Sequence, residues 1–384
     1  MRIALVHPYS FPEVLRGAER YLDDLSRYLA GQGHKVTIIT GAPRGSADNT
    51  ETARRSDARD GVMVERRRRF GGGPAGRFGV TEVETFGASV LGVLARLRPD
   101  VVHALTPTTA LAGVLVRRPT LYTVLGHPDS SQLPPQAVPR HAFSLAVRHA
   151  TATATFSRAS ADALAESIGR RAIVLPPGVH LDRFPANLEP RTGPPTILFS
   201  ATLVDDRKRV ELAVAGFARL LEIHPHARLA LSGQGDPAKA LATATACGDH
   251  VAAALDVLGP GGPEEMPARY RAATVTVLPA QHEAFGIVLI ESLASGTPAV
   301  CTPEGGMPEL VGDTVGCIAE SATAEALEQA LCRAIDLAAD PTTPARCVER
   351  AARWDWERVV GPKHESVYEV LAAGRLLREN AGLR

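Results

Sequence analysis

The chain has 384 residues, which is too long for one hydrophobic core and sufficient for two domains. Apolar residues make up 45% and charged residues 22%, as in soluble globular proteins, and the formal net charge of zero excludes an overall attraction to nucleic acid or to an anionic membrane. The five cysteines are odd in number and include no C-x2-C pair, which disfavours a zinc site or a disulfide framework and predicts a reducing compartment.

The first 40 residues predict a Rossmann-like unit. Residues 3–6 form an apolar run typical of a buried parallel strand, residues 18–32 have the periodicity of a helix, and residues 36–40 predict the next strand. The intervening loop lacks G-x-G-x-x-G, so a dinucleotide-dependent dehydrogenase fits poorly. The opening apolar run is too short for a signal peptide. No apolar run in the sequence reaches the ~20 residues of a membrane-spanning helix. We therefore expect a cytoplasmic protein.

The first half continues this alternation as far as a proline-rich linker at residues 176–195. Residues 43–60 are polar and are expected to form a mobile loop. A basic run, Arg66 to Arg69, is either a solvated strand end or a contact for an anionic acceptor or a membrane surface. Another loop contains His127, which is either bonded to backbone or functional. Further strands are predicted at residues 62–65, 99–103, 120–124 and 152–156, and helices at residues 80–97 and 160–168.

The second half restarts the alternation. Residues 196–200 predict a strand and residues 210–223 a helix. The loop between them contains three successive cations, Arg207, Lys208 and Arg209. This part of the chain therefore places positive charge just after a predicted strand.

A second strand–helix–strand pattern spans residues 274–302. A strand at residues 274–278 precedes a polar turn, and the helix pattern at residues 285–295 ends at Gly296. A strand at residues 299–302 follows, and then Pro308 suits the first turn of another helix.

Two glutamates and a pair of glycines in this stretch suggest a ligand site. Glu283 and Glu291 are eight residues apart, so a helical rise of ~1.5 Å per residue separates them by about 12 Å. That distance is similar to the reach from ribose to hexose in a nucleotide-sugar. Gly305 and Gly306, before a helix start, offer backbone N–H groups and a positive dipole end for a diphosphate. Each feature alone also has an ordinary structural explanation.

The same stretch resembles the E-x7-E signature of the family 4 glycosyltransferases. The residues from Glu283 to Glu291 are followed by Ala-Ser-Gly-Thr-Pro-Ala-Val and by Gly-Gly-Met-Pro-Glu, so the flanks agree as well as the glutamates. The resemblance implies an α/β chain of the GT-B type, with two Rossmann-like domains facing across a cleft. It also implies a glycosyltransferase that uses a nucleoside diphosphate sugar and retains anomeric configuration.

The resemblance extends to the first half. Arg16-Gly17-Ala18-Glu19 is similar to the Gly-Gly-x-Glu loop of the family, which faces phosphate and acceptor, with Arg16 replacing the first glycine. His127 lies two positions later than the family's active-site histidine. We assign residues 1–187 to an acceptor-binding domain and residues 188–358 to a donor-binding domain. Residues 359–384 form a last helix that would cross back to the first domain.

In the second half, Lys208 matches a family lysine that binds the donor diphosphate. Thr202 stands where the family has a second diphosphate-binding arginine. Either Arg207 or Arg209 would supply the missing charge, and the sequence does not decide between them.

These matches imply a scheme in which Glu291 holds the ribose, Lys208 and the glycine N–H groups neutralise the diphosphate, and Glu283 orients the sugar. Because positive side chains would do this and no Asp-x-Asp is present, we expect neither a metal nor another cofactor. The expected catalytic residues are Glu283, Lys208 and His127, and the expected donor-binding residues are Glu291, Phe285, Gly286, Ile287, Gly305, Gly306, Arg207, Arg209 and Gly17.

The donor sugar, which would be a hexose or an N-acetylhexosamine, and its base, uracil or guanine, stay open. The acceptor would be a small molecule, a lipid or a glycan. Two alternatives also stay open: a GT-B sugar phosphorylase, and a non-catalytic nucleotide-sugar sensor that the substitution at Thr202 suggests.

Overall fold

The structure is a computed structural model that describes residues 1–374 except residues 12, 15, 43–55, 60, 72, 190 and 192. Most of the predicted mobile loop, and the end of the last predicted helix, lie outside the described residues. Residues 56–59 of that loop form strand β3. The chain divides into two compact units, one comprising Met1–Pro177 with the chain from Trp356 onward, and the other Gly178–Asp355.

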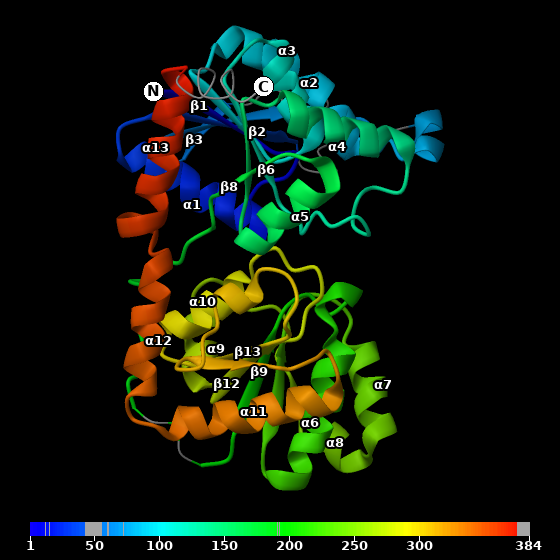
Figure 1. Ribbon diagram of the computed structural model, residues 1–384, viewed down its shortest axis with the longest axis vertical. Helices are drawn as coiled ribbons and strands as arrows, with labels where there is room; N and C mark the ends of the chain where they lie inside the picture. The colour runs from blue at the N-terminus through cyan, green and yellow to red at the C-terminus, as the bar shows by residue number, and fades with distance from the viewer. Residues whose placement is uncertain are drawn as a thin grey trace. The chain divides into compact units, whose positions relative to one another are not determined.

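The first unit is a parallel sheet with helices on both faces (Figure 1). The strand order is β3-β4-β2-β1-β5-β6-β7-β8, and only β3 runs antiparallel to its neighbour. The strands β5, β6 and β7 are buried at every position, because helices cover the sheet on both sides. The strands are β1 (Arg2–Val6), β2 (Lys35–Gly41), β3 (Ser56–Arg59), β4 (Val62–Arg67), β5 (Val101–Ala104), β6 (Thr120–Val124), β7 (Ala152–Thr155) and β8 (Ile173–Val174). The helices are α1 (Gly17–Gly31), α2 (Glu82–Leu97), α3 (Pro107–Leu115), α4 (Ala137–His149), α5 (Arg158–Ile168) and α13 (Gly361–Ala372), with a 3-10 segment at Gly73–Phe78.

Helix α13 (red in Figure 1) is held in the first unit by buried hydrogen bonds. His364 Nε2 lies 2.8 Å from the Tyr21 hydroxyl, and His103 Nδ1 lies 2.7 Å from the Tyr368 hydroxyl. Burial lowers the pKa of His364 to about 4 and that of His103 well below its usual range. Both imidazoles are therefore neutral in the folded chain at neutral pH.

We expect this docking to weaken in acid. The unfolded chain protonates these histidines as the pH falls through about 6.5, whereas the folded chain keeps His364 neutral down to about pH 4. Their contribution to the free energy of unfolding is thus complete above pH ~6.5 and is lost as the pH falls toward 4. The urea midpoint should drop between pH 7.5 and pH 5, and His364→Gln should reduce that drop. A matched change at the exposed His226 should leave it unchanged, and an equal pH dependence in all three proteins would contradict this account.

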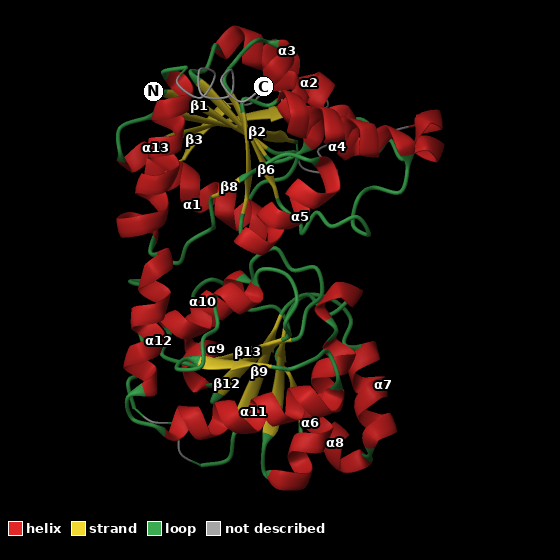
Figure 2. Ribbon diagram, viewed as in Figure 1, coloured by secondary structure: helices red, strands yellow, loops and turns green. Residues whose placement is uncertain are grey.

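The second unit is also a parallel sheet between helices, which Figure 2 colours yellow and red. Its strand order is β11-β10-β9-β12-β13-β14, and every neighbouring pair is parallel. The strands are β9 (Thr196–Ser200), β10 (Arg228–Ser232), β11 (Leu255–Val257), β12 (Val275–Leu278), β13 (Ala299–Cys301) and β14 (Gly316–Ile318). The helices are α6 (Val210–Ile223), α7 (Ala238–Cys247), α8 (Asp249–Ala253), α9 (Met266–Ala272), α10 (Ile287–Ala294), α11 (Ala324–Ala339) and α12 (Thr343–Ala351), and a π-helical turn at Trp356–Val360 leads back to α13.

The order of strands in the second unit reverses between β9 and β12. From β9 the chain first builds outward through β10 and β11, and then returns to the other side of β9 with β12, β13 and β14. Loops at the carboxyl ends of β9 and β12 therefore leave in opposite directions, and this is the point at which doubly wound sheets generally bind ligands. The prediction of two Rossmann-like halves is confirmed.

Candidate functional site

The loops that follow β9 and β12 are joined by side-chain and backbone contacts. The Lys208 amine forms a short ion pair with the Glu283 carboxylate, and both side chains are about one-fifth exposed. The backbone N–H of Gln281 donates to the carbonyl of Arg207 at 2.8 Å. Two residues that are 75 positions apart in the chain thus meet at the point where the sheet order reverses.

The Gly305–Gly306 turn packs against the same loop. Gly305 has φ +66°, and the N–H of Gly306 donates to the carbonyl of Glu283 at 2.8 Å. A Cβ on Gly305 would lie 2.1 Å from that carbonyl oxygen, so only glycine allows this approach. Glu283 and the glycine turn are therefore positioned by each other.

This turn corrects one expectation. The sequence predicts a helix after the glycines. The structure instead has a single 3-10 turn of three residues, Met307–Glu309, which ends at Leu310. A turn of that length has no substantial dipole, and the Gly306 N–H is already used by Glu283. The diphosphate expected from the sequence would therefore have to be bound mainly by side chains.

The cations beside Lys208 differ in their partners. Arg207 forms a fork with Asp205 two residues earlier, at 3.1 Å and 2.7 Å. Burial raises the pKa of Asp205, but the hydrogen bond and charge of Arg207 outweigh that effect and leave this pKa below its usual range. Arg209 instead reaches across to the Glu304 carboxylate, with Nη1 2.6 Å from Oε2, and to the Gln281 side chain at 2.7 Å. Arg209 thus contacts the residue before the glycine turn, and Arg207 is paired within its own loop.

Glu291 lies on α10 and is buried, with 1% of its surface exposed. The Tyr270 hydroxyl donates to its carboxylate at 2.9 Å and also lies 3.3 Å from the Ser200 hydroxyl at the end of β9. A buried carboxylate held by a neutral hydroxyl keeps its capacity to accept hydrogen bonds, which suits recognition of hydroxyl groups.

The remaining predicted donor residues open α10. Gly286 is the N-cap with φ +95°, Ile287 is the first helical residue, and Phe285 is buried. The Phe285 ring packs edge-on against Trp354 at 6.2 Å, and the Arg350 guanidinium lies 5.3 Å from the Trp354 ring. Trp354 therefore supports the start of α10.

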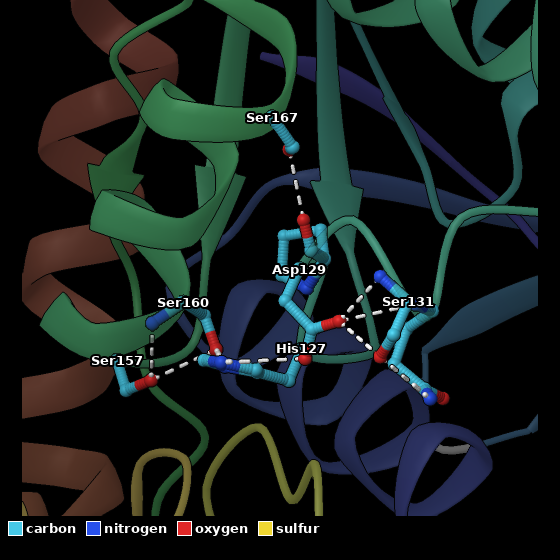
Figure 3. Close-up of polar contacts among 8 residues, drawn as sticks. His127, Asp129, Ser131, Ser157, Ser160 and Ser167 are labelled. Atoms are coloured by element: carbon cyan, nitrogen blue, oxygen red, sulfur yellow. Dashed lines mark hydrogen bonds and ion pairs between the residues drawn. The ribbon is translucent and has the colours of Figure 1, made fainter.

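In the first unit, His127 lies on the loop after β6 (Figure 3). Its Nδ1 is 3.1 Å from the Ser160 hydroxyl, which accepts a hydrogen bond from the Ser157 hydroxyl at 3.0 Å. Ser157 is the N-cap of α5, and Asp129 lies 4.0 Å from His127 Nε2. Ser160 and Asp129 are thus two of the side chains that orient the imidazole.

The loop after β1 places Gly17 at the first position of α1. Arg16 donates to the Glu19 carboxylate at 2.9 Å, and His7 lies 3.4 Å from the same oxygen. Burial raises the pKa of Glu19, but His7 and Arg16 more than offset it, so the pKa is lowered. Arg16 therefore replaces the family glycine with a cation that stabilises an ionised, buried glutamate.

The basic run Arg66 to Arg69 makes several contacts inside the first unit. Arg66 donates to Glu13 at 2.8 Å, and Arg69 donates to the Ala42 carbonyl at 2.9 Å. Arg69 also lies 4.8 Å from the Tyr9 ring.

The described residues show neither a metal-binding cluster nor a helix suited to span a membrane. They hold no group of three or more histidine, cysteine, aspartate or glutamate side chains arranged to bind a metal ion. None of the helices they form combines the length and the apolar character needed to cross a bilayer.

Sequence reasoning missed three residues that shape this site. Glu304 and Gln281 both bind Arg209, and Tyr270 binds Glu291. The first two could have been noticed because they adjoin the glycine pair and the Glu283 turn, whereas nothing in the sequence around Tyr270 indicated its contact.

Comparison with known proteins places the chain in a family. The family model described as "Glycosyltransferase Family 4" matches residues 15–183, and the one described as "Glycosyl transferases group 1" matches residues 182–354. A glycogen synthase of Mycobacterium tuberculosis is 28% identical over 94% of this chain and 92% of its own length. Sucrose-phosphate synthase from Thermosynechococcus elongatus has a similar structure, with a TM-score of 0.79, 20% identity and coverage of 97% of this chain and 99% of that one. Alr3699/HepE of Anabaena, solved in complex with UDP-glucose, has a TM-score of 0.72 at 18% identity and covers 96% of this chain and 100% of its own. The GT-B expectation is thereby confirmed.

Proposed function

This chain belongs to the family 4 glycosyltransferases, and on that basis we propose that it moves a sugar from a nucleoside diphosphate sugar to an acceptor held by its first unit. We further propose that transfer retains the anomeric configuration and needs no metal ion. One observation carries the proposal: the Lys208 amine, the Glu283 carboxylate and the Gly305–Gly306 turn meet where the sheet order of the second unit reverses.

In this scheme the second unit binds the donor. Buried Glu291 accepts hydrogen bonds from the ribose hydroxyls, and Lys208 binds the diphosphate. Glu283, with the N–H groups of Phe285, Gly286 and Ile287, orients the sugar. When the donor binds, the Lys208 amine also contacts a phosphate, and the Glu283 carboxylate also accepts a hydrogen bond from a sugar hydroxyl.

Catalysis in this scheme is electrostatic. The bond between the anomeric carbon and the phosphate oxygen breaks, and negative charge develops on the leaving diphosphate beside Lys208. The acceptor oxygen attacks from the same face, and the leaving phosphate takes its proton, so the configuration is retained. A fixed ammonium group supplies the stabilisation that a metal would otherwise provide. In this proposal His127 and Gly17, both in the first unit, keep their expected roles as a catalytic residue and a donor-binding residue.

A thermal-shift panel tests the donor assignment. UDP, GDP, dTDP and ADP, and their glucose or mannose derivatives, are added separately, and a ligand bound only by the folded chain raises the melting temperature. One nucleotide series should raise it by several degrees, and UDP is the first candidate because the Anabaena neighbour was solved with UDP-glucose. No shift with any diphosphate would contradict the proposal. Phosphorolysis of a disaccharide with inorganic phosphate and no nucleotide would instead identify a phosphorylase.

A further inference from the structure

Arg209 and Glu304 form an ion pair that links two parts of the donor loops. Arg209 Nη1 and Nη2 lie 2.6 Å and 3.2 Å from the two oxygens of Glu304, and Nη2 also donates to Gln281 at 2.7 Å. Both terminal nitrogens of the guanidinium group therefore contact one carboxylate. The side chains are 23% and 36% exposed, so water screens the pair only partly.

The backbone of Arg209 directs its side chain to this position. Arg209 has φ +51°, a left-handed conformation that is unfavourable for a residue other than glycine. Arg209 is both the C-cap of the 3-10 turn Asp206–Lys208 and the N-cap of α6. The chain therefore turns sharply after Lys208, and neighbouring cations leave the turn toward different partners.

Arg207 and Arg209 are the two candidates to replace the family arginine, whose position Thr202 occupies in this chain, and their geometry differs. Arg207 forms its fork with Asp205 inside its own loop, whereas Arg209 reaches the residue that precedes Gly305. Arg209 thus reaches the residue before the glycine turn by a direct ion pair, whereas Arg207 acts on Glu283 through its charge while it pairs with Asp205.

A diphosphate and the Glu304 carboxylate would compete for the same guanidinium. Phosphate oxygens accept two parallel N–H bonds from arginine in the way that a carboxylate does. Glu304 also brings a negative charge next to the turn, where it repels an incoming diphosphate. The donor site of this chain thus contains a built-in anion that holds one of its cations.

From this arrangement we propose that Glu304 is an internal competitor of the donor: it holds Arg209 in the empty site, yields it to the diphosphate, and takes it back when the nucleoside diphosphate leaves. The inference rests on the proposed function, because it assigns a diphosphate to this turn. Its consequence is that Glu304 weakens the binding of donor and product alike and favours product release.

Calorimetric titration of UDP, GDP and ADP into the full chain tests the competition. Glu304→Gln should tighten whichever diphosphate binds by roughly tenfold, since it removes one partly screened charge interaction. Arg209→Gln should weaken that binding by a similar factor. In the Arg209→Gln background, Glu304→Gln should have a much smaller effect, because the two residues act through one contact.

A matched control pair joins β10 to the edge strand β11 of the same sheet. Arg228, at the start of β10, forms a comparable fork with Asp256 on β11, with Nε 2.6 Å from Oδ2. Asp256→Asn should leave the dissociation constants unchanged, which excludes a general effect of net charge.

The outcomes separate the two proposals. If the unmodified chain binds none of the diphosphates, the assignment of a nucleotide donor fails, and the inference fails with it. If it binds one but Glu304→Gln leaves the affinity equal or weaker, only the competition is overturned. Equal tightening by Glu304→Gln with and without Arg209 would also overturn it, since the effect would then not pass through that arginine.

Discussion

Replacing Lys208 by methionine is expected to lower kcat by roughly 100- to 1,000-fold, the usual cost of losing one fixed group that stabilises developing charge. Methionine keeps the length and apolar stem of lysine and removes the charge. Because Lys208 and Glu283 are each only about one-fifth exposed, removing the amine leaves a largely buried carboxylate unpaired, so the melting temperature should also fall. Steady-state kinetics with the donor found in the thermal-shift panel, together with the melting curve, measure both effects.

Lys239→Met is the matched control for that variant. Lys239 also forms ion pairs in the second unit, with Asp206 in the same loop as Lys208 and with Glu211 on α6, but it is 55% exposed. Its replacement should leave kcat within about twofold, as expected for an exposed pair. If Lys208→Met were to turn over at a nearly normal rate, the assignment of this amine to the leaving diphosphate would be wrong.

Gly305→Ala is expected to abolish measurable donor binding and to lower the free energy of unfolding by about 1–3 kcal/mol, the cost of forcing a side chain into a left-handed backbone. The added methyl group would lie 2.1 Å from the Glu283 carbonyl oxygen, so the turn must move away from that loop. Movement would break the Gly306 N–H bond to Glu283 and displace its carboxylate from Lys208. Titration with UDP and a urea unfolding curve report the two losses separately.

Gly312→Ala provides the comparison, because a Cβ at Gly312 would meet nothing within 4 Å. That variant should bind donor and unfold like the original chain. Normal donor binding by Gly305→Ala would show that the close approach of the turn to Glu283 is not required for the site.

Much of the site was accessible to sequence reasoning because it depends on short-range patterns. Glu283 precedes helix α10 and Glu291 lies within it, so the spacing of the two glutamates could be read directly from the sequence. Gly305 was recognisable as a turn glycine, and the structure gives it a positive φ. The prediction of a helix after Gly305 was wrong. A proline that suits a first helical turn does not determine whether the following residues continue the helix, and here the turn ends after Met307–Glu309.

Partners that lie far apart in the chain could not be predicted in this way. The sequence left Arg207 and Arg209 equivalent, since both adjoin Lys208 in one loop. Which of them reaches the glycine turn depends on a left-handed backbone at Arg209 and on Glu304, 95 residues later. The contact of Tyr270 with Glu291 likewise requires α9 and α10 to pack in the folded unit.

The sequence by itself determined the alternation of strands and helices, the two Rossmann-like halves and the family, because periodicity and motif spacing are properties of neighbouring residues. Only the tertiary structure decided that Lys208 pairs with Glu283, that Arg209 pairs with Glu304, and that His364 and Tyr368 fix α13 in the first unit. The Lys208–Glu283 pair arises because the strand order of the second sheet brings β9 beside β12, and the Arg209–Glu304 pair joins the loop after β9 to the loop after β13. The α13 contacts depend on where that helix packs in the first unit, and no local pattern encodes either arrangement.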